Sequence, residues 1–301
     1  MNRLIHTLAL FALLLVAPLA RAELKVLACE PEWGALVKEL AGDKVSVYVA
    51  TTALQDPHRI EARPSLVAAA RNAGLVVCTG AELEVGWLPL LIRQSGNSAI
   101  QPGKPGHFEA AAYVRMLDVP QRLDRADGDV HAAGNPHIQT DPRNIALVAE
   151  PLARRLAELD PANAATYQAR SADFLTRWKA AIQRWEQSAA PLRGVPVVVQ
   201  HKAFPYLQQW LGLVEVAALE PKPGVEPTSA HLSTVLAGLK TRPAKMILRA
   251  AYNDPRGADW LAERTQLPVV VLPFTVGGNE QAKDLFSLFD DTVQRLLKAS
   301  R

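Results

Sequence analysis

The sequence predicts an α/β protein with two Rossmann-like lobes, each built on a parallel sheet, joined by a long linking helix. In both halves of the chain, short apolar segments alternate with amphipathic segments, as parallel strands alternate with the helices that connect them. Between the halves, apolar residues recur at three- and four-residue spacing from Ala162 to about Ser188. This spacing predicts a helix long enough to connect two lobes.

The first residues have the pattern of a removable signal peptide. Asn2-Arg3 form a short basic region, an apolar stretch runs from Leu8 to Leu19, and Ala20-Arg21-Ala22 is a small-residue cleavage pattern. The apolar stretch is shorter than the ~20 residues that span a bilayer. We therefore expect residues 1–22 to be removed, and the mature protein to be periplasmic without stable membrane insertion.

The first half of the mature chain predicts a βαβαβ order. The expected strands are Leu24–Cys29, Lys44–Ala50 and Leu75–Cys78, and the expected helices are Trp33–Leu40 and Pro64–Asn72. Residues 101–142 are rich in Gly, Pro and Asp and have little periodicity, so we expect an exposed loop region there. A helix from Asn144 to Leu159 follows.

The second half repeats the alternation. Expected strands are Val195–Gln200, Val214–Ala218, Lys245–Leu248 and Val269–Leu272, and expected helices are Tyr206–Leu211, His231–Lys240, Ala258–Thr265 and Ala282–Lys298. The predicted organisation is a signal peptide at 1–22, a first lobe at 23–159, a linking helix at 160–190 and a second lobe at 191–301.

Charge and cysteine content narrow the possible partners. The formal net charge is +3, with both signs spread along the chain, so there is no basic stripe typical of a nucleic-acid-binding protein. The two cysteines, Cys29 and Cys78, each end an expected strand. In an exported protein they could form a disulfide, or they could be two buried thiols.

Three histidines occur in loops beside residues that fix the backbone. They are His58 in Asp56-Pro57-His58, His137 in Asn135-Pro136-His137, and His201 directly after a predicted strand. Neutral imidazole suits Zn²⁺, Cu²⁺ and Ni²⁺, whereas Mn²⁺ prefers oxygen-rich shells. Together the three histidines indicate a zinc site, with a carboxylate or water in the fourth position.

Four motifs in this order resemble the zinc and manganese solute-binding proteins of ABC importers, and the resemblance covers nearly all of the mature chain. The motifs are Asp56-Pro57-His58 with Glu61 and Pro64-Ser65, Gly134-Asn135-Pro136-His137 with Asp141-Pro142, His201-Lys202-Ala203-Phe204-Pro205-Tyr206, and Pro223-Gly224-Val225-Glu226-Pro227.

The resemblance implies a rigid linking helix and a metal held between the lobes, with His58 and His137 from the first lobe and His201 from the second. Manganese members of the family resemble this chain except for a glutamate in place of His201, so the resemblance favours Zn²⁺ over Mn²⁺. It also suggests Asp284, at the start of the last helix, as the fourth ligand. The alternative is that Asp284 only caps that helix.

Other polar residues near the motifs are expected to have lesser roles. His131 is a candidate auxiliary ligand in the exposed loop region. Glu61 and Glu226 are interpreted as structural residues, which either form hydrogen bonds in the fold or bond to the ligating rings without contacting the metal.

The predicted function is therefore capture of Zn²⁺ by a monomeric, non-enzymatic protein that delivers the metal to an ABC permease. One alternative is an exported zinc hydrolase, because three histidines and a water also describe a catalytic zinc site. The sequence, however, contains no His-Glu-x-x-His motif. A second alternative is a zinc chaperone or adhesin on the same fold.

Overall fold

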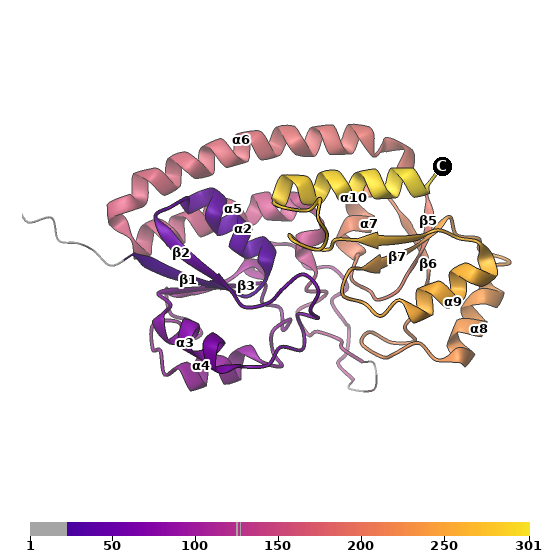
Figure 1. Ribbon diagram of the computed structural model, residues 1–301, viewed down its shortest axis with the longest axis horizontal. Coiled ribbons are helices and arrows are strands. Elements are labelled where there is room, and N and C mark those ends of the chain that lie inside the picture. The colour runs from indigo at the N-terminus through magenta and orange to yellow at the C-terminus, as the bar shows by residue number, and fades with distance from the viewer. Residues whose placement is uncertain (1–22, 125, 127) are drawn as a thin grey trace, which may run out of the picture.

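The computed structural model describes residues 23–124, 126 and 128–301. The predicted signal peptide, residues 1–22, lies outside the described residues. Two four-stranded sheets form the centres of two lobes, with strand orders β2-β1-β3-β4 and β6-β5-β7-β8 (Figure 1). All of the paired strands are parallel. The predicted fold class, an α/β protein with two parallel-sheet lobes, is confirmed.

The strands are short and apolar, as the sequence predicted. In the first lobe they are β1 (Leu24–Ala28), β2 (Val45–Val49), β3 (Leu75–Cys78) and β4 (His107–Glu109), and in the second lobe β5 (Pro196–Val199), β6 (Val214–Ala218), β7 (Met246–Ala250) and β8 (Val269–Leu272). Nearly continuous apolar strands such as β3 and β5 are typical of parallel sheets covered on both faces.

Helices connect the strands, and proline occupies the first position of several of them. They are α2 (Pro31–Ala41), α3 (Pro64–Asn72), α4 (Leu88–Ser95), α5 (Pro142–Leu159), α6 (Ala164–Ser188), α7 (Pro205–Leu211), α8 (Ser229–Gly238), α9 (Arg256–Thr265) and α10 (Leu285–Ala299). Proline suits this position because its fixed φ is helical and its missing N–H would have no partner there.

The helix α6 runs along both lobes, with α5 and α10 beside it (Figure 1). It buries Phe174, Trp178 and Trp185 against these neighbours. The indole Nε1 of Trp178 donates to the carbonyl of Pro142 at 2.8 Å, and that of Trp185 donates to Asp290 at 2.6 Å. One hydrophobic cluster includes these side chains and core residues of both sheets. The two lobes therefore share a core.

The structure contains a helix and a strand that the sequence did not predict. Helix α4 carries Pro89 in its first turn and is followed by Gly96 at its C-cap, and strand β4 has only three residues. Strand β4 lies in the region expected to be an exposed loop. The end of that region is also different from the prediction, because Pro136 to Asp141 are buried beneath the junction of the lobes.

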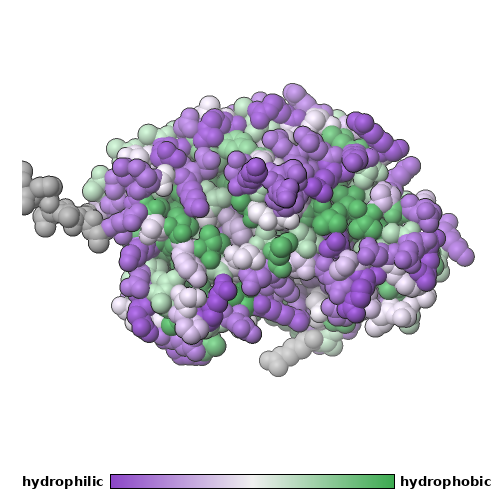
Figure 2. Space-filling view, in the orientation of Figure 1, coloured by the Kyte–Doolittle hydropathy of each residue, from purple (hydrophilic) through white to green (hydrophobic). Residues whose placement is uncertain are grey.

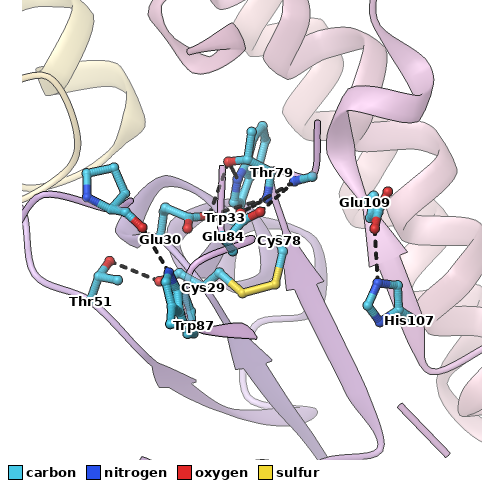
Figure 3. The surroundings of a disulfide bond; sticks show 12 residues. Cys29, Glu30, Trp33, Thr51, Cys78, Thr79, Glu84, Trp87, His107 and Glu109 are labelled. Atoms are coloured by element: carbon cyan, nitrogen blue, oxygen red, sulfur yellow. Dashed lines mark hydrogen bonds and ion pairs between the residues drawn. A yellow bond between two sulfur atoms is a disulfide. The ribbon is translucent and has the colours of Figure 1, made fainter. Parts of the chain in front are cut away.

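A disulfide joins Cys29 to Cys78, which decides between the two alternatives that the sequence left open (Figure 3). The bridge follows from the sheet, because β1 and β3 are parallel neighbours and both cysteines lie at their carboxyl ends. Beside it the carboxylates of Glu30 and Glu84 are buried around Thr79, whose backbone N–H donates to Glu84 at 2.7 Å. Burial raises the pKa of Glu84 to about 7.

Hydrophilic residues cover most of the face drawn in Figure 2, and apolar residues gather in smaller separate patches. Over the described part of the chain, we find no helix with the length and apolar character needed to cross a bilayer.

Candidate metal centre

Three histidines from both lobes converge at the junction of the lobes. His58 lies in the loop between β2 and α3, His137 precedes a short 3₁₀ helix before α5, and His201 follows β5 by two residues. The ring centroids are 5.3 Å apart for His58 and His137, 6.0 Å for His58 and His201, and 5.5 Å for His137 and His201. One nitrogen from each ring lies within 4.8 Å of the other two.

The nitrogen spacing matches the geometry of a tetrahedral zinc shell. Zn–N bonds of about 2.0–2.1 Å place two nitrogens of such a shell about 3.3–3.4 Å apart. Nε2 of His137 lies 3.4 Å from Nε2 of His201. Both side chains are almost fully buried, at 1% and 7% exposure. Burial, followed by the neighbouring histidines, holds the pKa of His137 well below its usual value, which favours the neutral, ligating form of the ring.

Carboxylates orient two of the three rings. Nδ1 of His58 lies 2.7 Å from Oδ1 of Asp56, and Nδ1 of His201 lies 2.6 Å from Oε2 of Glu220. When Nδ1–H donates to a carboxylate, the lone pair is on Nε2, the nitrogen available to a metal. Nε2 of His58 is buried and has no hydrogen-bond partner among the described residues. The two carboxylates thus leave the Nε2 lone pairs of His58 and His201 available to a metal between the rings.

The backbone around His58 and His137 has the same local structure. In each case an Asp or Asn side chain accepts the N–H of the histidine two residues later, at 3.0 Å for both Asp56 and Asn135. The residue between them is proline, which fixes φ and has no N–H of its own. This repeated turn fixes the backbone of both histidines, although neither residue lies in a helix or a strand.

An aromatic wall closes one side of the site. The ring of Phe274 lies 5.4 Å from that of His137 and 5.3 Å from that of Tyr252. Phe274 follows β8 and has a φ of 69°, in the left-handed region. The buried apolar ring of Phe274 excludes water beside His137 and so strengthens electrostatic interactions there.

Asp284 does not join the histidines. It is an exposed residue at the N-cap of α10, where its carboxylate accepts the N–H of Ser287 at 2.7 Å and the Ser287 hydroxyl completes a capping box. The side chain thus has the capping role that the sequence left as the alternative, and it lies outside the group formed by the three histidines. An Asp followed three residues later by a polar side chain is a helix-start signature, and here that local role accounts for it.

The predicted hydrogen-bonding partners also differ from those observed. Glu61 and Glu226 are exposed, and Asp56 and Glu220 are the carboxylates that bond to the ligand rings. Asp56 directly precedes the Pro57-His58 pair, so it could have been recognised from its position. Glu220 lies 19 residues after His201 and gave no such signal.

His131, the predicted auxiliary ligand, does lie at the site. Its ring stacks on that of His58, with centroids 5.4 Å apart and planes inclined by 26°. It lines an open cavity of about 410 Å³ together with His137 and His201.

Comparison with known proteins identifies the family of this chain. The family described as zinc-uptake complex component A, periplasmic (ZnuA), matches residues 26–299. The chain is 26% identical over 271 residues to the high-affinity zinc uptake system protein ZnuA of Paracoccus denitrificans, covering 79% of each protein. It is 23% identical over 290 residues to the manganese ABC transporter substrate-binding lipoprotein PsaA of Streptococcus pneumoniae, covering 91% of this chain and 90% of that protein.

Solved structures share the fold. A crystal structure of ZnuA aligns with a TM-score of 0.77 over 92% of this chain and 99% of that chain, at 23% identity. A zinc-bound ZnuA with residues 138–173 deleted aligns with a TM-score of 0.75 over 92% of this chain and 98% of that chain, at 25% identity. Because the family match spans almost all of the described residues, the protein belongs to the ZnuA family and is a solute-binding protein of metal import.

Proposed function

We propose that this protein captures Zn²⁺ in the periplasm with His58, His137 and His201 and delivers it, as a monomer, to the permease of an ABC importer. The observation that carries the proposal is the 3.4 Å separation of the His137 and His201 Nε2 atoms. These two nitrogens come from different lobes, and their spacing is already that of two ligands of one zinc ion.

The donor set supports zinc over manganese. Three imidazole nitrogens suit Zn²⁺, whereas Mn²⁺ prefers carboxylate and carbonyl oxygens. The two carboxylates nearest the rings, Asp56 and Glu220, bond to ring nitrogens. The names of the relatives include both a zinc and a manganese transporter, so the choice of metal rests on the side chains.

Capture needs each ring in its neutral form with a lone pair directed at the metal. Asp56 and Glu220 hold two rings in that tautomer, and burial keeps His137 neutral. Since the first lobe supplies two ligands and the second lobe supplies one, a bound metal links the lobes directly. Occupancy thereby changes the junction that a permease could recognise.

The role in metal import places the protein among transport components and not in an enzyme family. We therefore interpret the open coordination position as part of a binding site for a transported ion, which must be released again, and not as a catalytic position. A hydrolase would also need a general base aligned with a metal-bound water.

The test is a zinc titration of the metal-free mature protein against a chromophoric chelator. We expect one tightly bound zinc per chain, and a large loss of affinity in His58→Ala, His137→Ala and His201→Ala. His231→Ala is the matched histidine control, because the His231 ring bonds to the carbonyl of Ala218 on the outer part of the second lobe. Asp284→Ala is the carboxylate control and should leave zinc affinity unchanged.

The proposal fails if the unmodified protein binds no zinc tightly or if the three histidine variants bind as well as the His231→Ala control. Tighter binding of Mn²⁺ than of Zn²⁺ in the same titration would overturn the choice of metal while leaving the site intact.

A further inference from the structure

The three histidines leave one corner of a tetrahedral shell open, and Asp284 does not fill it. The open side faces the cavity of about 410 Å³ that is lined by His131, His137 and His201. A protein ligand for the fourth position would come from the residues around this cavity, and the alternative is a water molecule. The following inference rests on the proposed zinc capture.

His131 stands at the spacing expected of a fourth imidazole ligand. Two imidazoles bound to one tetrahedral zinc have ring centroids about 5.2 Å apart, given Zn–N bonds of about 2.0–2.1 Å. The His131 and His58 centroids are 5.4 Å apart, within the range of the three predicted ligand pairs, from 5.3 to 6.0 Å. The His131 nitrogens are not in the group that lies within 4.8 Å. Ligation therefore requires the His131 ring to turn toward the shared centre.

The segment that carries His131, residues 128–134, crosses the junction of the lobes and is anchored to both. Its Asp129 N–H donates to the carbonyl of Pro223 in the second lobe at 2.8 Å. Its Ala132 N–H donates to the carboxylate of Glu82 in the first lobe at 2.6 Å. We call residues 128–134 the strap.

The contact of the strap with the second lobe depends on close backbone approach. Gly128 has a φ of 84°, and a Cβ placed there would lie 2.3 Å from the Pro223 carbonyl oxygen. The neighbouring carboxylate of Asp129 packs against Gly224, where an added Cβ would also overlap it. The Asp129 side chain is thus held at the second lobe. The side chain of the strap that reaches the metal site is His131, whose ring stacks on that of His58.

We propose that His131 is the fourth zinc ligand, supplied by the strap, so that the loaded site has four imidazole nitrogens. The same strap is hydrogen-bonded through Pro223 to the loop that begins with Glu220, the partner of His201. Zinc would thereby fix the strap across both lobes through His131, whose ring stacks on that of His58.

The first experiment counts the ligands in the unmodified protein by X-ray absorption spectroscopy of its zinc-loaded form. A zinc shell of four imidazole ligands supports the proposal, and a shell of three imidazoles and one oxygen ligand overturns it. Because no residue is changed, a folding defect cannot confuse the result.

The second experiment assigns the ligand through zinc titration and the visible spectrum of the Co²⁺-loaded protein. In His131→Ala, we expect the zinc Kd to rise by at least about 10-fold, a loss that removal of an outer-shell partner alone can reach, and the Co²⁺ bands to shift as water replaces nitrogen. His107→Ala, which removes a first-lobe histidine that bonds to Glu109, should change neither.

The outcomes separate the two proposals. If the unmodified protein binds one zinc and His131→Ala matches it in Kd and in Co²⁺ spectrum, only the fourth-ligand proposal is overturned. If the unmodified protein binds no zinc, the proposed function fails as well.

Discussion

Glu220 offers a quantitative test of how the second lobe presents its ligand. Its Oε2 lies 2.6 Å from Nδ1 of His201 and accepts the N–H of Gly224 at 2.8 Å, and the side chain is only 13% exposed. A hydrogen bond to a charged group contributes about 1.5–3 kcal/mol, and one between neutral groups about 0.5–1.5 kcal/mol. At 1.4 kcal/mol for each tenfold change, Glu220→Ala should weaken zinc binding by about 10- to 150-fold.

A graded comparison separates charge from orientation. Glu220→Gln keeps an oxygen that can accept from Nδ1 but removes the charge, so it should lose about 1–1.5 kcal/mol, or roughly 5- to 10-fold in Kd. The assay is competitive zinc titration at fixed pH and salt. Glu226→Gln, an exposed carboxylate of the same loop region, is the control and should bind as the unmodified protein does.

Zinc binding by Glu220→Ala within about twofold of the control, in a variant that circular dichroism shows to be folded, would contradict this orienting role of Glu220. An equal loss in the Ala and Gln variants would show that the negative charge, and not the orientation of the ring, is the whole effect.

Three other predictions concern stability and acid. Replacing both Cys29 and Cys78 by Ala should lower the free energy of unfolding by about 2–4 kcal/mol, measured by urea unfolding of the oxidised protein and the variant. Trp178→Ala should cost about 3–5 kcal/mol in the same assay, because the ring is fully buried under α6; a cost below 1 kcal/mol would contradict the shared core. Burial raises the pKa of Glu84 from 4.5 to about 7, so the folded state holds this proton more tightly than the unfolded chain. The Glu84 carboxyl should therefore contribute a loss of stability to the metal-free protein as pH rises from about 4.5 to about 7, and Glu84→Gln should lose less stability over that range than the unmodified protein; an equal change in the two proteins between about pH 5 and pH 8 would count against it.

Most of the fold could be predicted because its strands are short apolar runs with polar boundaries. The observed bounds of β3, β6 and β8 are those predicted. Strand β4 could not be predicted in this way, since His107 and Glu109 flank a single buried Phe108. A strand of three residues has too few positions to show a period, and only its pairing with β3 defines it.

The three histidines could be selected from the sequence because each has a local signal: a preceding proline, or a position directly after a strand. Asp284 shows the limit of such signals. A carboxylate before a helix is expected both for a ligand and for a cap, and only the distance to the histidines separates the two. Glu220 and Phe274 had no signal at all, because their roles arise where the second lobe meets the first.

The shared core restricts how metal binding can be communicated. A large hinge motion between the lobes would pull α6 and its tryptophans away from a cluster that includes both sheets, at a cost of several kcal/mol for each large side chain exposed. The spacing of His137 and His201 is already that of two zinc ligands, so loading needs no such motion. The binding energy is then available to order smaller elements. The strap has hydrogen bonds to both lobes and carries a histidine whose ring stacks on His58. Under the proposed ligation by His131, it is a part of the surface where a loaded and an empty site would differ.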